Sequence, residues 1–469
     1  MTRQPPKPKV GILGLTLEFY EQRGPATREG REEFVREQLL PLLSEVADVT
    51  FDGAVFRRED IEARVAEFER DGVDVLLVLC LTYSTSLSSL PALQQTRLPI
   101  VIWNTQELYS VDESYSGADL SANHGVHGTF DLCNVLVRSG LRFGYVTSHI
   151  NDTDCKEKVA DVLQAASAVT RLKNTRLGLI GYPFPGMGDF GLDTTHLAGT
   201  LGCAWDAISV AEFNKRADEA DPKSADGLVA DYRSRYDIAE DITDEDLKVT
   251  AAAELALRGI VDDYRLDAYS YQFLSFGQDD RTKTLPFVAA SRLLEEGVGF
   301  GGEGDLIAAA YSTILNWLSP PASFSEIFTT DFAGNSVLLS HMGEANAAMH
   351  RKDAKLRMVK RPTSLVPVQA SQLALAVSYE PCPATLTALT LVDDGIWRII
   401  ASQAELIDFG PLEHLYVPHA KAAPSGDVRD FLTAYATSGG PHHMAVCFGD
   451  ATSRLANFAM LLGADYVEV

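Results

Sequence analysis

Apolar runs alternate with amphipathic stretches along the first 170 residues of the chain. Runs rich in Val, Ile and Leu, such as VDVLLVLCLT, have the composition of strands that are covered on both faces. Between these runs, apolar residues recur at the three- and four-residue spacing of a helix. The pattern predicts strands at 9–17, 73–82, 98–103 and 143–149, and helices at 27–46, 58–71, 126–139 and 153–171. Such an alternation is typical of a doubly wound parallel sheet.

The same pattern restarts further along the chain. A strand-like run opens it, and it closes with the glycine-rich heptapeptide GFGGEGD and an apolar stretch at helical spacing. The predicted segments are strands at 176–182 and 268–276, helices at 242–263 and 287–296, and a turn at 299–305. We therefore predict a second doubly wound, Rossmann-like domain.

After Pro320-Pro321 the alternation of strand-like and helical segments ends. The segments NSVLLSHMG, QLALAVSYE, ATLTALTLVDD and GIWRIIASQ resemble strands joined by turns, and helices are predicted near 428–437 and 452–462. The fold class that follows is α/β, with two doubly wound parallel-sheet domains and a β-rich C-terminal domain. The predicted domains are 1–170, 171–319 and 320–469.

Composition narrows the range of partners. A formal net charge of −25 argues against nucleic acid or an anionic membrane, because both require clustered Lys and Arg. No apolar run approaches the roughly 20 residues of a membrane-spanning helix. The 6 cysteines form no CxxC pair, which is typical of reduced thiols and favours a cytoplasmic protein.

The GFGGEGD turn isolates one carboxylate, Glu303, among glycines. Glycine-rich turns before helices often bind phosphate through bare backbone N–H groups, with a Lys or Ser/Thr close behind. Here Glu303 and Asp305 would repel a phosphate and attract a cation. We expect the glycines to clear space for a metal and its ligand, and Asp305 to cap the following helix.

Further carboxylate and imidazole side chains follow in the third predicted domain: Glu326, His341 and the pair His442-His443. Two carboxylates and two neutral imidazoles balance the charge of a divalent ion of the manganese, cobalt, iron or zinc group. A glutamate beside a turn or a histidine in a strand is ordinary by itself. The prediction of a metal site therefore rests on these residues taken together.

Several motifs together resemble the L-arabinose isomerase family, within the wider group that includes the L-fucose isomerases. The most specific are GVGFGGEGD, SFSE followed by LLSHMG, and GGPHHM, in that order; LPIVIWNTQ, HGVHGTFD and ATLTALTLVDDGIWRIIAS extend the resemblance over nearly the whole chain. The resemblance implies an aldose–ketose isomerase with Mn²⁺, or another divalent ion such as Co²⁺, that acts on a monosaccharide. It also implies a homo-oligomer, a hexamer in that family, whose sugar pocket is completed between subunits.

The resemblance further assigns roles to individual residues. It implies the metal ligands Glu303, Glu326, His341 and His443, with both glutamates as the catalytic acid/base pair. Asp331 competes with Glu326 for the second carboxylate position, because related fucose isomerases use an aspartate there. The implied sugar-pocket residues are His442, His127, Gln106, Phe276, Met187 and Met342.

The chain departs from the family at places that affect substrate choice. Gly14-Leu15-Thr16-Leu17-Glu18 replaces a stretch with a hydrogen-bonding Gln, Asn104 stands where a His is familiar, and the segment 351–370 differs in length. We therefore expect weak activity on L-arabinose and better activity on another aldose. A non-catalytic sugar-binding or regulatory relative, and a metal-dependent lyase or epimerase, are the alternative functions. For an isomerase, proton transfer through an enediolate and a hydride shift both remain open.

Overall fold

The chain is described by a computed structural model that covers residues 7–22, 24–362 and 365–469. Within these residues it forms two compact units. The N-terminal unit comprises 7–171 and 453–464, and the C-terminal unit comprises 172–452 and 465–469. The last helix therefore packs with the first part of the chain, and an ion pair between Arg454 Nε and Asp161 Oδ1, 2.6 Å apart, holds it there.

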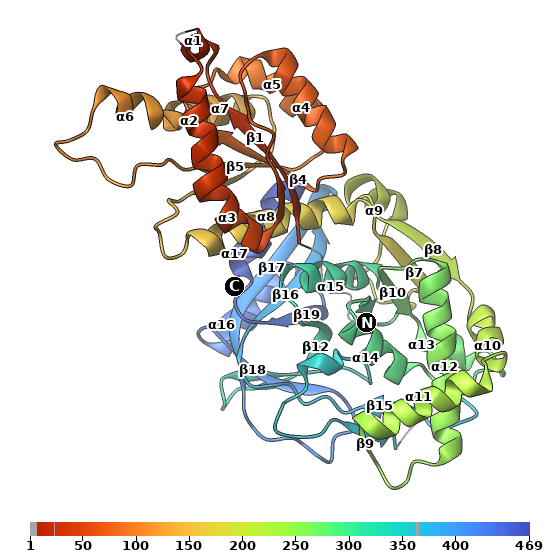
Figure 1. Ribbon diagram of the computed structural model, residues 1–469. Helices are drawn as coiled ribbons and strands as arrows, with labels where there is room; N and C mark the ends of the chain where they lie inside the picture. The colour runs from red at the N-terminus through yellow and green to blue at the C-terminus, as the bar shows by residue number, and fades with distance from the viewer. Residues whose placement is uncertain (1–6, 23, 363–364) are drawn as a thin grey trace. The chain divides into compact units, whose positions relative to one another are not determined.

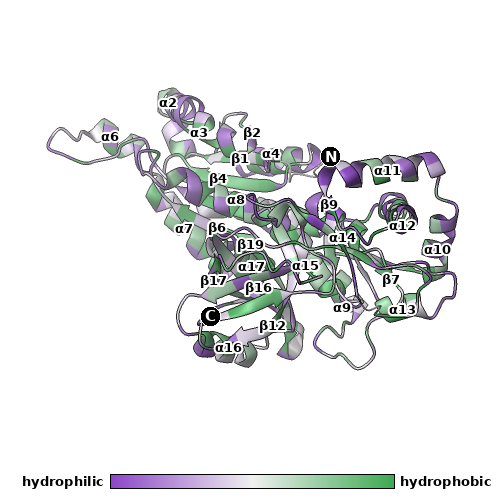
Figure 2. Cartoon of the chain, turned by 90° about the horizontal axis from the view of Figure 1, so that it is seen from below, coloured by the Kyte–Doolittle hydropathy of each residue, from purple (hydrophilic) through white to green (hydrophobic). Residues whose placement is uncertain are grey.

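A parallel sheet in the order β2-β1-β4-β5-β6 forms the centre of the N-terminal unit, and β3 also pairs with β1. Its strands are β1 (Lys9–Leu15), β2 (Asp48–Thr50), β3 (Ala54–Val55), β4 (Val75–Cys80), β5 (Ile100–Asn104) and β6 (Gly144–Thr147). Every residue of β4 is buried, as a strand covered on both faces requires, and Figure 2 shows this strand as hydrophobic. Helices lie on both sides of β1 and β4 (Figure 1), so the predicted doubly wound sheet is confirmed.

The helices of this unit follow the predicted periodicity closely. They are α1 (Glu18–Glu21), α2 (Ala26–Phe34), the π-helical turn η1 (Val35–Leu39), α3 (Leu40–Val46), α4 (Arg58–Arg70), α5 (Ser86–Gln95), α6 (Gly117–Ala122), α7 (Gly125–Arg138), α8 (Cys155–Leu172) and α17 (Thr452–Leu462). The sequence pattern missed α5, because its serines and the internal Pro91 disfavour a helix by local preference.

A second parallel sheet, in the order β11-β10-β7-β8, lies in the C-terminal unit. Its strands are β7 (Arg176–Ile180), β8 (Ala204–Ile208), β10 (Ala268–Tyr271) and β11 (Gly299–Gly301). The helices that belong to it are α9 (Thr194–Thr200), α10 (Val210–Asp218), α11 (Pro222–Arg235), α12 (Asp244–Asp263), α13 (Phe273–Gly277), α14 (Phe287–Glu295) and α15 (Leu306–Leu318). The predicted second α/β pattern is therefore confirmed.

One predicted strand in this region is wrong in its second half. The run 268–276 was expected to be a single strand, but β10 ends at Tyr271 and α13 begins at Phe273. The side chain of Gln272 accepts a hydrogen bond from the backbone N–H of Leu274 at 3.0 Å and caps the new helix. This local capping overrides the strand preference of the aromatic residues.

The rest of the C-terminal unit is a closed barrel in the order β16-β19-β12-β13-β18-β17, because β16 also pairs with β17. These pairs are antiparallel, and β20 adds to β17 in parallel. The strands are β12 (Ala322–Asp331), β13 (Ser336–Ser340), β16 (Pro383–Val392), β17 (Ile396–Ile407), β18 (His419–Pro424), β19 (His443–Phe448) and β20 (Asp465–Glu468). The predicted β-rich region is confirmed.

Smaller elements complete this unit. They are the sheet β15-β14-β9, with β9 (Asp237–Ile238), β14 (Arg357–Lys360) and β15 (Leu373–Leu375), the helix α16 (Val428–Thr437), and the 3-10 turns η2 (Ala347–Met349) and η3 (Asp393–Gly395). Among the described residues, no helix combines the length and apolar character needed to cross a membrane. None of the six cysteines, all of which are described, forms a disulfide, and burial raises the pKa of the Cys80 thiol to about 12.

Candidate metal centre

Neighbouring strands of the barrel bring the candidate ligands together. Glu326 on β12 lies opposite Ser340 of β13 on one side and opposite His443 of β19 on the other. His341 follows Ser340 directly, at the end of β13. Glu303 joins them from the turn between β11 and α15. Residues that are far apart in the sequence therefore meet at one point of the C-terminal unit.

Carboxylate oxygens and imidazole nitrogens form a compact cluster at this point. One ligand atom from each of Glu303, Glu326, His442 and His443 lies within 4.8 Å of the others. His443 Nε2 is 3.2 Å from Glu326 Oε1 and 3.7 Å from Glu303 Oε2. His341 Nε2 is 3.4 Å from the same Glu326 oxygen. Three of the four expected ligands thus form this group together with His442, and the fourth, His341, adjoins it through Glu326.

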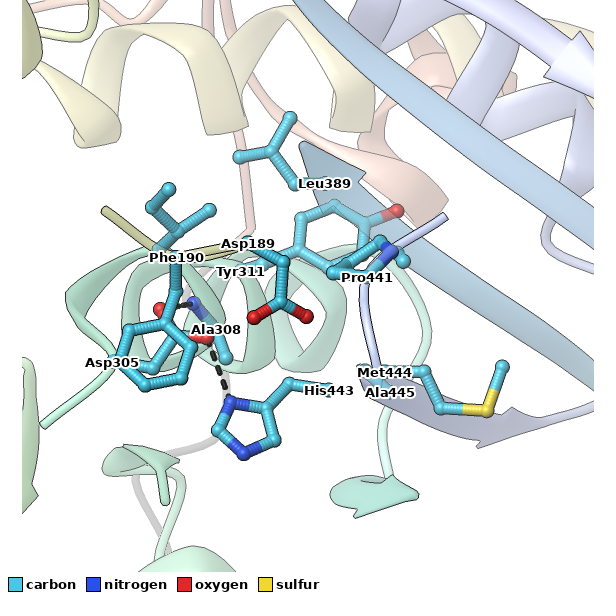
Figure 3. A pocket seen from close by; sticks show the side chains of 12 residues that line it. Asp189, Phe190, Asp305, Ala308, Tyr311, Leu389, Pro441, His443, Met444 and Ala445 are labelled. Atoms are coloured by element: carbon cyan, nitrogen blue, oxygen red, sulfur yellow. Dashed lines mark hydrogen bonds and ion pairs between the residues drawn. The ribbon is translucent and has the colours of Figure 1, made fainter. Parts of the chain in front are cut away.

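Each of the two buried imidazoles forms a hydrogen bond through its Nδ1 atom to a second carboxylate. His443 Nδ1 donates to Asp305 Oδ2 at 2.8 Å (Figure 3), and His341 Nδ1 donates to Glu344 Oε2 at 2.6 Å. Tyr271 donates a hydrogen bond to the other oxygen of Glu344. This carboxylate–histidine arrangement fixes the tautomer and leaves each Nε2 atom free to bind a metal.

The residues present fit a divalent cation. His443 Nε2 is a buried atom without a hydrogen-bond partner among the described residues, which is unusual for a polar atom unless it serves a ligand. Two carboxylates and two imidazoles are a suitable ligand set for a Mn²⁺-type ion. The cluster therefore has the ligand types, the orienting carboxylates and the unsatisfied nitrogen of a metal site.

The pKa shifts of the cluster residues also favour a bound cation. Burial opposes ionisation of Glu303, but the neighbouring imidazoles of His442 and His443 outweigh it and hold the pKa of its carboxyl at about 2. Burial also opposes protonation of His443, yet the surrounding carboxylates of Asp305, Glu303 and Glu326 raise its pKa well above the usual value. The clustered carboxylates thus stabilise positive charge, which a bound cation supplies when it displaces those protons.

Three glycines of the GFGGEGD turn lie close to other protein atoms. A Cβ at Gly301 would lie 2.3 Å from the Asp305 carbonyl oxygen, and one at Gly304 would lie 2.6 Å from Pro183 Cα. A Cβ at Gly302 would approach His341 Nε2 at 3.1 Å. The glycines therefore allow close approach of these protein atoms, and their clearing of space for a metal and a sugar stays a prediction.

Backbone strain and helix capping fix the position of Glu303. Its φ of 59° is a left-handed conformation that non-glycine residues seldom adopt, and such strain tends to occur at functional sites. Asp305 caps α15 as expected, since its Oδ1 accepts from the Ala308 N–H at 2.9 Å. Because its other oxygen accepts from His443, one aspartate connects the helix start to the metal centre.

Of the expected sugar-pocket residues in the C-terminal unit, His442 belongs to the cluster and Met342 follows His341. His442 Nε2 is 3.7 Å from Glu303 Oε2, and the His442 side chain is 39% exposed. Met342 follows His341 directly and is half-buried, and Met187 is half-buried in the segment after β7. Phe276 is fully buried against Phe213 and Tyr271, so the structure shows it packing in the core. Contact of these residues with a sugar stays a prediction.

Two further pocket residues, Gln106 and His127, belong to the N-terminal unit. Gln106 follows β5 and its side-chain amide donates to the Leu108 carbonyl at 2.8 Å. His127 is exposed on α7, with its ring centroid 4.3 Å from that of His124. Gln106 and His127 therefore belong to a different unit from the candidate metal centre.

The structure separates the two candidates for the second carboxylate. Glu326 lies in the cluster, whereas Asp331 ends β12 and pairs with Lys421 Nζ at 2.6 Å. Sequence reasoning missed two carboxylates that the structure places beside the histidines, Asp189 and Glu344. Glu344 stands three residues after His341, and that spacing was the available signal; Asp189 had none, since it is 253 residues from His442.

Known proteins match most of the chain. The family models described as the L-arabinose isomerase central domain and C-terminal domain match residues 193–320 and 321–465, and the model described as the fucose/sulfoquinovose isomerase N-terminal domain matches 25–173. The L-arabinose isomerase of Acidothermus cellulolyticus is 28% identical over 399 residues, which cover 82% of this chain and 78% of that protein. The L-arabinose isomerase of Phocaeicola vulgatus is 24% identical over 438 residues, or 90% and 85% of the two chains. Adjoining matches to two domains of one enzyme, with full-length relatives of the same name, confirm the resemblance: the chain belongs to the L-arabinose isomerase family.

Proposed function

We propose that this chain is a divalent-metal-dependent aldose–ketose isomerase in which Glu303 and Glu326 act as the acid/base pair. Membership of the family makes it an intramolecular oxidoreductase that acts on a sugar. The observation that carries the finer proposal is the geometry of His443 Nε2, which is buried, unsatisfied and within 3.7 Å of both glutamates. The ligands we propose are Glu303, Glu326, His341 and His443, and the ion is Mn²⁺ or Co²⁺.

The two glutamates have the properties that the isomerisation needs. Moving a carbonyl between C1 and C2 requires a proton to leave one carbon and return to its neighbour. Glu303 and Glu326 reach the cluster from different elements, so each can serve one side of a sugar bound there. When bound, a divalent ion polarises the sugar carbonyl as a Lewis acid and lowers the pKa of the adjacent hydroxyl.

The substrate we propose is an aldose other than L-arabinose. At the carboxyl end of β1, Leu15 and Thr16 are buried and replace the hydrogen-bonding Gln of the family. The N-terminal match to a fucose/sulfoquinovose isomerase domain also supports a substrate other than L-arabinose. Weak conversion of L-arabinose is therefore expected.

A sugar panel and isotope exchange test the proposed reaction. Protein loaded with Mn²⁺ is assayed for ketose formation from pentoses, hexoses and deoxysugars, and the best reaction is repeated in D₂O. Deuterium at C1 or C2 of the product by NMR is the expected result, because an enediolate exchanges its proton with solvent. Conversion without deuterium supports a hydride shift instead. Failure to convert any sugar with metal bound favours a sugar-binding protein, or a lyase or epimerase.

We also propose a homo-oligomer, a hexamer, in which His127 of one copy faces the metal centre of another. The distribution of the proposed pocket residues over the two units supports this proposal. Gln106 and His127 belong to one unit, and the metal cluster belongs to the other. Light scattering of the active protein is expected to give a mass several times that of one 51.0 kDa chain. An active monomer contradicts this proposal. Six cysteines that form no disulfide fit the cytoplasmic location that we propose.

A further inference from the structure

His442 is the most open member of the cluster. Its side chain is 39% exposed, whereas those of Glu303 and Glu326 are 15% and 16% exposed and that of His443 is 1% exposed. Its Nε2 atom lies 3.7 Å from Glu303 Oε2. A ligand that enters the cluster from solvent therefore meets this imidazole, and the direction of its Nε2 atom decides which contact it offers.

One carboxylate oxygen of Asp189 holds His442 at two points. Asp189 Oδ2 accepts from the backbone N–H of His442 at 2.9 Å and from its Nδ1 at 2.6 Å. The first bond fixes the backbone at the start of β19, and the second fixes the rotation of the ring. Because Nδ1 is held by Asp189, the Nε2 atom of the ring is directed toward Glu303 in the cluster.

The loop that carries Asp189 is itself anchored to the site. The adjacent Phe190 is 3% exposed, and its ring stacks on that of His443 with centroids 5.2 Å apart and planes at 10°. Figure 3 shows Asp189 and Phe190 beside His443 and Pro441 in one small pocket. At the start of the loop, the Phe184 N–H donates to the Glu303 carbonyl at 2.9 Å. The position of Asp189 is therefore set by contacts with the metal centre.

We propose that Asp189 is a positioning residue, which holds the His442 ring so that Nε2 faces the cluster and contacts a hydroxyl of the bound sugar. This inference rests on the proposed function. Asp189 acts through His442 and touches neither the metal ligands' coordinating atoms nor the reacting carbons. Its loss displaces a substrate contact while the metal cluster itself stays intact.

Kinetics of Asp189 variants test this role. Asp189→Ala removes both hydrogen bonds and is expected to lower kcat/KM by about 10- to 100-fold, the scale of a misplaced substrate contact. Metal content and melting temperature are expected to stay as in the wild-type chain. Asp189→Asn keeps a carbonyl oxygen that can accept both bonds and is expected to recover most of the loss. Asp193→Ala, in the same loop, removes only the cap of α9 and serves as the matched control.

A crystal structure of Asp189→Ala gives a readout that does not depend on activity. The His442 ring is expected to rotate so that Nε2 no longer faces Glu303. An unmoved ring, a rate unchanged from wild type, or an equal loss in the Asp193→Ala control overturns the inference. If the wild-type chain converts no sugar, the proposed function fails, and the position of the ring in the variant still decides whether Asp189 holds it.

Discussion

Replacing either Glu303 or Glu326 with glutamine is expected to lower kcat by about 10²-fold or more, the scale of a lost general acid or base. A glutamine side chain is close in size to glutamate and keeps one oxygen in the cluster, but it cannot take up and return a proton at neutral pH. Steady-state rates of both metal-loaded variants, on the sugar that the wild-type chain converts best, measure the effect. Metal content of the same samples separates a lost proton carrier from a lost ligand.

Asp331→Asn is the matched control for these variants. Asp331 lies on the same strand as Glu326, but it is ion-paired with Lys421 outside the cluster. Its kcat is expected to stay within about twofold of wild type, because exposed substitutions away from a site have small effects. Full activity of Glu326→Gln combined with an inactive Asp331→Asn would assign the second carboxylate to Asp331 and contradict our proposal.

The second large effect concerns metal binding. Replacing His443 with alanine is expected to weaken metal affinity by at least about 10-fold, since even the residues that orient a ligand contribute this much. His341→Ala is expected to behave in the same way, because its Nε2 atom is likewise aimed at Glu326 by a carboxylate behind the ring. Metal content by elemental analysis after dialysis, together with Mn²⁺ titration calorimetry, measures both variants.

An exposed histidine provides the control for metal binding. His414 lies on the surface, and His414→Ala is expected to retain the metal content of the wild-type chain. Unchanged metal content in both His443→Ala and His341→Ala would place the ion elsewhere. A loss in His443→Ala alone would make His442 rather than His341 the second imidazole ligand, since His442 belongs to the cluster and His341 lies beside Glu326.

Local pattern predicted most of the helices and strands, and its failures have physical causes. Helix α16 was predicted with its observed bounds, because a single apolar face and flanking turn residues define it locally. The strand predicted through 268–276 ended early, because the Gln272 side chain caps a helix that hydrophobicity does not reveal. Helix α5 was missed, since packing in the N-terminal unit outweighs the unfavourable Pro91.

The sequence by itself determined the types and the order of the site residues. Glu303, Glu326, His341 and His443 are recognisable because metal chemistry restricts the choice of side chains and the family motifs preserve their surroundings. Their adjacency in the structure follows from strand register, which sets Glu326 directly opposite His443. Asp331 is excluded from the cluster by distance, since five residues of strand span about 16 Å.

Only the tertiary structure decided which carboxylates form hydrogen bonds with the histidines of the site. Asp305 was expected to cap a helix, but its second bond, to His443, depends on how β19 passes α15. Asp189 meets His442 across 253 residues of chain, and no local spacing encodes such a contact. The physical reason is that periodicity and capping are properties of neighbouring residues, whereas hydrogen bonds between distant segments arise only when the packing of sheets and loops brings them together.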